Sequence, residues 1–174
     1  SSIEHLVTVL PDIKLGISLE KSLSNPGYNL TSYNIESSST TSSLAIYYQA
    51  LKQRTENLAL SLKLDSKNTN TNLLGSQISH DQIRALRAGA TYDFFDEFGG
   101  YNFVVAKFTQ GLDILDASQA GDLNLTKSNA KPNFRKFEAS LQSQQNIDQD
   151  ISLVAASSVQ FSSDTLYSSE LFGY

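Results

Sequence analysis

The residue types that could do chemistry are few, and their spacing suits catalysis poorly. Ser79, His80 and Asp81 carry the side chains of a hydrolytic triad. Direct neighbours in an extended segment cannot converge as nucleophile, base and orienting acid, because a triad is defined by its geometry. We therefore interpret these residues as a polar loop that leads into a strand.

The paired carboxylates indicate turns rather than acid–base or metal sites. Asp96 and Glu97 lie in a turn, and nothing in the sequence gives them the defined separation across a cleft that glycoside hydrolysis requires. Asp148 and Asp150 lack the further oxygen ligands and central glycine of a calcium loop. The chain has no cysteine and two histidines, which excludes thiolate chemistry and disfavours a multi-histidine metal site. We expect neither an enzyme nor a cofactor or metal.

The best functional candidates are four charged residues near the middle of the chain. Arg87 and Asp93 share one face of an alternating segment, and Asp81 and Arg84 lie close by in sequence. In a polar interior such charges could contact another molecule or pair with neighbouring charges. Because half-buried charges usually pair, we favour a salt-bridge network that holds the wall in shape.

The elements that position these charges alternate with the period of a β-strand. Residues 13–20 and 58–65 place aliphatic residues on one face and small or polar residues on the other, as strands with one apolar face do. Weaker alternation predicts further strands within 3–9, 43–50, 86–94, 104–109, 136–142 and 151–161. The pattern therefore predicts eight strands, most of about 8–11 residues.

Charge and loop length both follow this pattern. The strand charges fall on the polar face, namely Lys14, Glu20, Lys63, Arg87, Asp93, Lys107, Lys136 and Glu138. Short connections alternate with long ones: 11–12, 51–57, 95–100 and 143–150 are short, and 21–41, 66–82 and 112–133 are long. Outer-membrane barrels combine short periplasmic turns, long external loops and strands with a lipid-facing apolar side. We therefore expect the short turns to be periplasmic.

Composition is compatible with such a barrel. No run approaches the roughly 18 apolar residues of a membrane helix, and the net charge of −5, without a basic cluster, argues against a nucleic-acid partner. Five aromatic residues flank one short turn and suit an interfacial girdle: Phe94, Phe95, Phe98, Tyr101 and Phe103. A soluble antiparallel sheet packed against another layer is the alternative.

Three stretches carry a family resemblance. They are DQIRALRAGATYD at 81–93 with Gly99-Gly100 shortly after it, FTQGLDIL at 108–115, and LYSSELFGY at 166–174. Together they resemble the barrel region of the haemolysin activation/secretion proteins, the outer-membrane transporters of two-partner secretion. The segment 47–58 and Asn25-Pro26-Gly27 also fit the strand–turn–strand pattern of that family.

The resemblance implies an all-β protein, an antiparallel transmembrane β-barrel segment of about eight strands within a barrel of about sixteen. It implies that residues 1–174 are a partial outer-membrane barrel domain, with the periplasmic domains and the pore-folding loop of the family outside this chain. The implied activity is export of a large exoprotein across the bacterial outer membrane. The implied partners are that exoprotein, unfolded in transit, and the lipid bilayer, without a cofactor or nucleic acid.

The candidate site combines lumen-facing residues with residues of the family phrases. These candidates are Asp81, Arg84, Arg87, Gly89, Asp93, Gly99, Gly100, Lys107, Gln110, Gly111, Ser169, Glu170, Phe172 and Gly173. Two alternatives stay open, a complete eight-stranded outer-membrane barrel with a structural or adhesion role, and a soluble β binding module. The stretch 162–174 does not alternate, which argues against a closing strand there.

Overall fold

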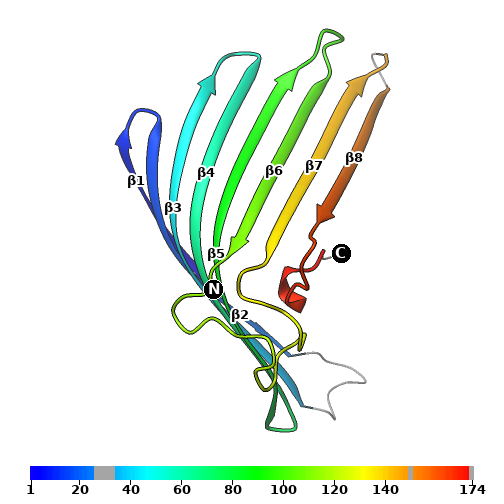
Figure 1. The fold of residues 1–174 in the computed structure, drawn as a ribbon. Coiled ribbons are helices and arrows are strands. Elements are labelled where there is room, and N and C mark those ends of the chain that lie inside the picture. The colour runs from blue at the N-terminus through cyan, green and yellow to red at the C-terminus, as the bar shows by residue number, and fades with distance from the viewer. Residues whose placement is uncertain (26–33, 149–150, 173–174) are drawn as a thin grey trace.

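The computed structural model describes residues 1–25, 34–148 and 151–172, and its strands form one antiparallel sheet in chain order (Figure 1). The strands are β1 (Ser2–Leu10), β2 (Ile13–Ser24), β3 (Ile35–Lys52), β4 (Glu56–Leu73), β5 (Ser76–Phe95), β6 (Tyr101–Gly111), β7 (Arg135–Asn146) and β8 (Ser152–Phe161). One 3₁₀ turn, Ser168–Glu170, follows β8. The prediction of an all-β, eight-stranded antiparallel segment is confirmed.

The strand register separates the sheet into an apolar face and a polar face. Leu64 of β4 lies opposite Leu44 of β3 and Leu86 of β5. One residue along, Lys63 lies opposite Arg87. Because successive side chains point to opposite faces of a strand, these rows continue as two separate surfaces. All eight predicted polar-face charges lie on the same face as Lys63, and we call this shared alternation along the strands their parity.

The apolar face is exposed across the sheet. Residues between 37% and 57% exposed include Leu15, Ile17, Leu19, Leu44, Ile46, Leu60, Leu62, Leu64, Leu86, Phe108, Phe137, Leu141 and Val159. On β5 this band runs from Leu86 to Phe94, roughly 26 Å along the strand at about 3.3 Å per residue. With a strand tilt of about 40°, this length corresponds to a height of roughly 20 Å along the barrel axis. That height is close to the apolar band of about 25 Å in an outer-membrane barrel. A soluble monomer rarely exposes so large an apolar surface.

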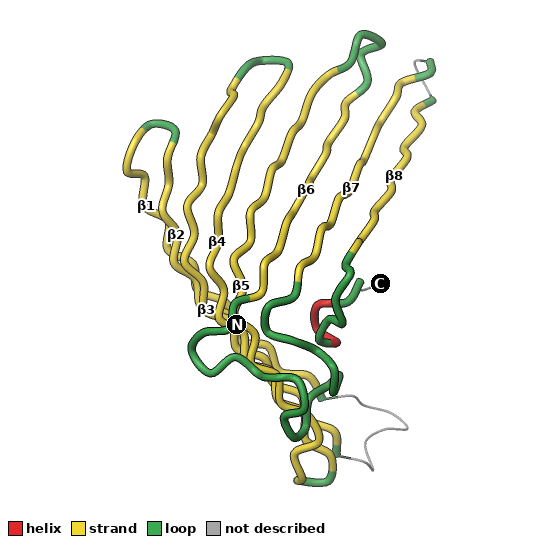
Figure 2. The backbone as a smooth tube through the Cα atoms, viewed as in Figure 1, coloured by secondary structure: helices red, strands yellow, loops and turns green. Residues whose placement is uncertain are grey.

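The sheet is open in the described part of the chain. β1 and β8 stand at the two ends of the strand order and are not paired with each other, as the fan of strands in Figure 2 shows. The alternative of a closed eight-stranded barrel is therefore not what the structure forms. No helix among the described residues is long and apolar enough to cross a membrane.

Three of the four short connections are confirmed as tight turns or short links, and the β5–β6 turn shows what stabilises one of them. The fourth, 143–150, includes residues 149–150, which lie outside the described residues. Asp96 Oδ1 accepts hydrogen bonds from the backbone N–H of Phe98 at 3.0 Å and of Gly100 at 2.9 Å. Asp96 Oδ2 accepts from the side-chain amides of Asn102 and Gln145. These bonds, that from Asn102 first, lower the pKa of Asp96 below its ordinary value. The turn thus depends on an ionised Asp96.

The aromatic residues around that turn divide between the two faces. Phe94 stacks on Tyr92 on the apolar face, with ring centroids 4.9 Å apart. Phe95 contacts Tyr101 from across the ladder, and Phe98 is exposed at the turn. An interfacial role for this group stays a prediction.

Of the three predicted long loops, 66–82 is wrong, and 21–41 is shorter than predicted because strands occupy both of its ends. β4 continues to Leu73 and β5 starts at Ser76, joined through Leu74 and Gly75, which both have positive φ as a tight hairpin turn requires. The described part of 21–41 likewise belongs largely to β2 and β3, while Pro26 and Gly27 lie outside the described residues. Strands β3, β4 and β5 therefore reach 18, 18 and 20 residues, longer than predicted.

The strands were predicted too short because the ends of β3 and β4 and the start of β5 are polar on both faces. We call this part of the sheet the polar ladder. Here Ser, Thr and Asn occupy both faces, so no apolar period marks the strand. Cross-strand hydroxyl contacts support it instead, such as Ser37 Oγ to Thr71 Oγ1 at 3.3 Å and Ser39 Oγ to Thr69 Oγ1 at 3.2 Å. The 79–81 triplet also lies in β5 rather than in a loop. The third long loop, 112–133, is confirmed as irregular.

Candidate functional site

A chain of charges with alternating sign crosses the polar face from β4 to β7. In order of contact these charges are Lys63, Asp65, Arg87, Glu170, Lys136, Glu138 and Lys107. Its centre is Arg87, whose Nε donates to Asp65 Oδ2 at 2.8 Å. The same guanidinium holds Glu170 through two bonds of 2.6 and 3.1 Å, the bidentate geometry that carboxylates favour.

The lysines extend this network across the sheet. Lys136 Nζ lies 2.7 Å from Glu170 Oε2 and 3.3 Å from Glu138 Oε2. Lys107 Nζ lies 2.9 Å from the same Glu138 oxygen, because these two residues are directly opposite each other in the ladder. The prediction of a salt-bridge network on this face is confirmed for Arg87, Lys107 and Lys136.

Glu170 is the deepest member of the network, although it lies outside the strands. Its side chain is 3% exposed, and that of Lys136 is 5% exposed. Burial raises the pKa of Glu170, but the hydrogen bonds and charges of Arg87 and Lys136 lower it to about 2. The carboxylate is therefore ionised at neutral pH and ties residues after β8 to the polar face.

Residues 117–134 and 162–172 fold together over this network on the polar face, and we call these two segments the inner layer. Its small apolar core contains Ile83, Ala85, Ala130, Phe134, Leu166 and Tyr167. Ile83 and Ala85 come from β5 with the parity of Arg87, which places the core on the polar face. The rings of Phe134 and Tyr167 meet edge to face at 6.1 Å.

Polar contacts join the two segments of the inner layer to β5. The buried Asp81 carboxylate accepts from the backbone N–H of Thr126 at 3.0 Å and from its hydroxyl. Thr126 Oγ1 in turn accepts from the N–H of Ser168 at 3.1 Å. The Tyr167 hydroxyl donates to the carbonyl of Ser118, and burial raises the pKa of Tyr167 to about 12. The inner layer is thus a packed structure with specific anchors.

The structure gathers five of the fourteen predicted candidates around one cavity. This polar cavity of about 450 Å³ is lined by Arg87, Gly89, Lys107, Ser169 and Glu170 together with the network residues of β4 and β7. Asp81 lies on the same face, nearer to the start of β5. Gly111 lies beside the inner layer, where an added Cβ would come 2.1 Å from the Pro132 carbonyl oxygen.

The other candidates lie elsewhere. Arg84 and Gln110 have the opposite parity, so they lie on the apolar side and not toward the lumen. Asp93 accepts a hydrogen bond from Asn57 at 3.0 Å and does not join the network. The remaining candidates are Gly99 and Gly100, which form the β5–β6 turn, Phe172, which lies on the polar side near β8, and Gly173, which is outside the described residues.

Several residues of the site were missed at the sequence level. Asp65 had the correct parity but was not singled out, and Thr126, Phe134 and Tyr167 gave no periodic signal because they lie in irregular segments. One signal was available in β5, where Ile83 and Ala85 place apolar side chains on the polar face. The described residues contain no group of three or more side chains suited to hold a metal ion.

An open antiparallel sheet with one exposed apolar face and one charged, partly covered face defines part of a transmembrane β-barrel wall. Residues 16–173 match the family described as haemolysin secretion/activation protein ShlB/FhaC/HecB. The chain belongs to this family.

A solved structure agrees with that family in its fold. The chain is similar to CdiB from Escherichia coli, with a TM-score of 0.65 and 18% sequence identity, and the match covers 89% of this chain. It covers 29% of the CdiB chain, so this chain spans less than a third of that protein. No curated protein matches the chain significantly.

Proposed function

We propose that residues 1–174 form a partial barrel domain of an outer-membrane transporter, which secretes a large exoprotein by two-partner secretion. The observation that carries this proposal is the division of one sheet into a lipid-compatible apolar face and a charged polar face. The family assignment supports the transport role, and the open edges at β1 and β8 support further strands that close a barrel of about sixteen. The setting we propose is the bacterial outer membrane.

The polar face suits the passage of an unfolded polypeptide. Its lysines Lys63 and Lys107 are the most exposed members of the network, at 37% and 41% of the side chain. Surface charges of this kind make weak, salt-sensitive contacts, which a moving chain can form and release. We propose no chemical step, and the folding of the exoprotein outside the cell supplies the driving force.

The inner layer restricts the path that an exported polypeptide can take along the polar face. It covers the outer part of the polar face along β5 and β7 through anchors at Asp81 and Glu170. A polypeptide that follows this wall must therefore pass beside the inner layer or displace it. The buried ionic contacts of Glu170 make displacement the costlier of the two.

A photo-crosslinking experiment tests the proposal. The full-length transporter is produced with its exoprotein, and a photo-reactive amino acid replaces either Lys107 on the polar face or the neighbouring Phe108 on the apolar face. We expect adducts with the exoprotein from position 107 and none from position 108. The same photo-reactive amino acid is also placed at Lys63 and at Lys14 on the polar face. The proposed path is contradicted if export proceeds normally and none of the three polar-face positions gives an adduct.

A further inference from the structure

Arg84 is a buried cation at the outer rim of the apolar face. It lies opposite Ser66 in the ladder. This pair is the next one on the same face after Leu64 and Leu86. It is 6% exposed, and among the described residues it forms no salt bridge, although the charge of the nearby Asp116 carboxylate acts on it. A buried cation is rarely left without an anion, because its desolvation is costly.

The protein itself satisfies only part of this guanidinium. Nε donates to the Leu115 carbonyl at 3.1 Å, and Nη1 donates to Asn68 Oδ1 at 2.8 Å and to the carbonyls of Lys67 and Ile83. Among the described residues, Nη2 has no hydrogen-bond acceptor. The planar guanidinium therefore still presents two donors, which match the oxygens of a phosphate.

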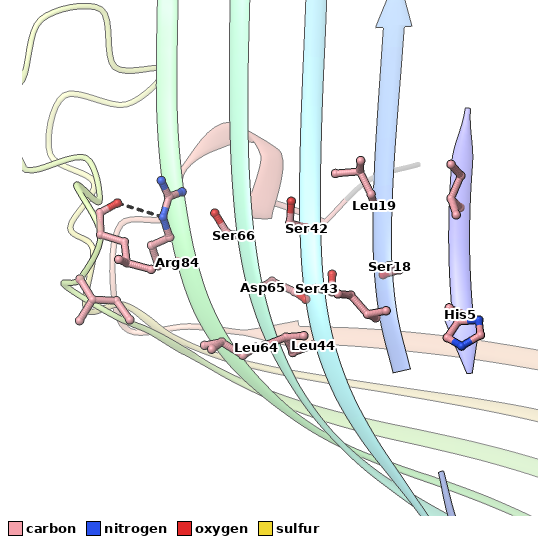
Figure 3. Close-up of a pocket in the computed structure, with 14 residues that line it drawn as sticks. His5, Ser18, Leu19, Ser42, Ser43, Leu44, Leu64, Asp65, Ser66 and Arg84 are labelled. Atoms are coloured by element: carbon pink, nitrogen blue, oxygen red, sulfur yellow. Dashed lines mark hydrogen bonds between the residues drawn. The ribbon is translucent and has the colours of Figure 1, made fainter. Parts of the chain in front are cut away.

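An apolar pocket of about 540 Å³ adjoins Arg84 on this side of the sheet. Figure 3 shows Arg84, Ser66, Ser42 and Leu19 in sequence across β5, β4, β3 and β2, with the bond from Arg84 to the Leu115 carbonyl dashed. Its aliphatic lining consists of Ile3, Ile17, Leu19, Leu44, Leu64, Ile114 and Leu115, and besides Arg84 the remaining lining residues are His5, Asp65 and four serines. The row through Ser42 and Ser66 is where the apolar band changes to the polar ladder, the depth at which lipid headgroups lie.

The loop at the mouth of the pocket is strained in a way that exposes apolar groups. Leu115 and Asp116 have φ of +50° and +57°, the left-handed region that strains residues other than glycine. This conformation leaves Ile114 45% and Leu115 70% exposed. The bond from Arg84 to the Leu115 carbonyl holds the loop there. Apolar side chains held out at the membrane rim suit contact with lipid tails.

We propose that Arg84 and this pocket form a binding site for an anionic lipid of the surrounding bilayer. Its phosphate accepts from Nη2 of Arg84, and an acyl chain occupies the pocket between Leu19, Leu44 and Leu64. The site rests on the proposed function only in that the apolar face meets lipid. Secretion is not its readout, so the lipid site can fail while the transport role stands.

Native mass spectrometry of the detergent-purified full-length transporter with phosphatidylglycerol tests the site. Two variants address its two halves: Arg84→Gln removes the cation, and Leu44→Trp fills the pocket while Arg84 and its loop stay intact. Arg54→Gln removes an arginine from the β3–β4 turn at the opposite end of the sheet and is the matched control.

We expect each of the two site variants to weaken phosphatidylglycerol binding roughly tenfold, as loss of a charge-assisted contact does, and the control to bind as the parent does. The proposal is overturned if either site variant folds and binds phosphatidylglycerol with unchanged affinity. If Arg84→Gln does not fold, Leu44→Trp decides the test. Competition by millimolar inorganic phosphate alone also overturns it, since the site would then take a free anion rather than a lipid.

Discussion

Glu170→Gln tests whether the charge network holds the inner layer in place. The substitution keeps the size of the side chain and removes its charge from between Arg87 and Lys136. Breaking a buried ion pair costs about 3–5 kcal/mol. We expect the lower end, about 3 kcal/mol, because Arg87 retains Asp65, Lys136 retains Glu138, and the new amide oxygen still accepts one bond.

Hydrogen exchange measures this loss directly. The Ser168 amide donates to Thr126 Oγ1, so it exchanges only when the segment after β8 leaves the loop 112–134. A loss of about 3 kcal/mol in the free energy of that opening raises the exchange rate by roughly two orders of magnitude. The readout is amide exchange of the peptide that contains Ser168 in the full-length transporter, reconstituted in lipid at neutral pH.

Two comparisons make the result decisive. Glu97→Gln makes the same chemical change on an exposed residue of the β5–β6 turn and should leave exchange at Ser168 unaltered. Arg87→Gln combined with Glu170→Gln should cost less than the sum of the two single changes, since the residues act as one pair. Exchange at Ser168 that stays at the parent rate in Glu170→Gln would refute the network as the anchor.

Three further predictions follow from particular contacts. Thr126→Val removes the hydroxyl bond to the buried Asp81 and the acceptor of the Ser168 N–H, while the backbone bond to Asp81 stays. It should destabilise the docked loop by about 1–3 kcal/mol and increase trypsin cleavage at Lys127 and Lys131; equal cleavage would show that the loop does not depend on the Thr126 hydroxyl. Asp96→Asn should lower the thermal stability of the barrel at pH 7. Because the folded pKa of Asp96 is depressed, its contribution is present above the ordinary aspartate pKa and is lost as pH falls through the lowered value, so melting temperatures of parent and variant should converge toward acid pH. Leu62→Arg on the apolar face should cost roughly 2–4 kcal/mol in lipid, whereas Ser61→Arg on the polar face should cost far less; similar urea midpoints in vesicles for both would contradict the assignment of faces.

Much of the fold could be predicted because one face of each strand must be apolar and the other polar. The alternation of Leu60 and Leu62 with Ser61 and Lys63 reports that requirement directly. The same logic failed beyond Ser66, where both faces are polar and the hydrophobic period carries no information. There the ladder continues because each strand extends a pairing that the apolar band already fixes.

The candidate site could be predicted only in part because its contacts are distant in sequence. Parity alone placed Arg87 on the correct face. Its partner Glu170 lies 83 residues away in a segment without periodicity, and only the family resemblance drew attention to it. The parity of Arg84 was available too, yet that residue was grouped with Arg87 because of its place in the same phrase.

The central claim is that β4 separates lipid from an aqueous channel, and cysteine scanning tests it most directly. Single cysteines are placed at each of positions 59–65 in a cysteine-free full-length transporter in its native membrane, and each is offered a water-soluble, membrane-impermeant maleimide. We expect labelling with a period of two: positions 59, 61 and 63 react, and positions 60, 62 and 64 are protected until detergent is added. Position 65 should react more slowly than 63, because the Asp65 side chain is buried in the charge network. Equal labelling at all seven positions before detergent is added would contradict it.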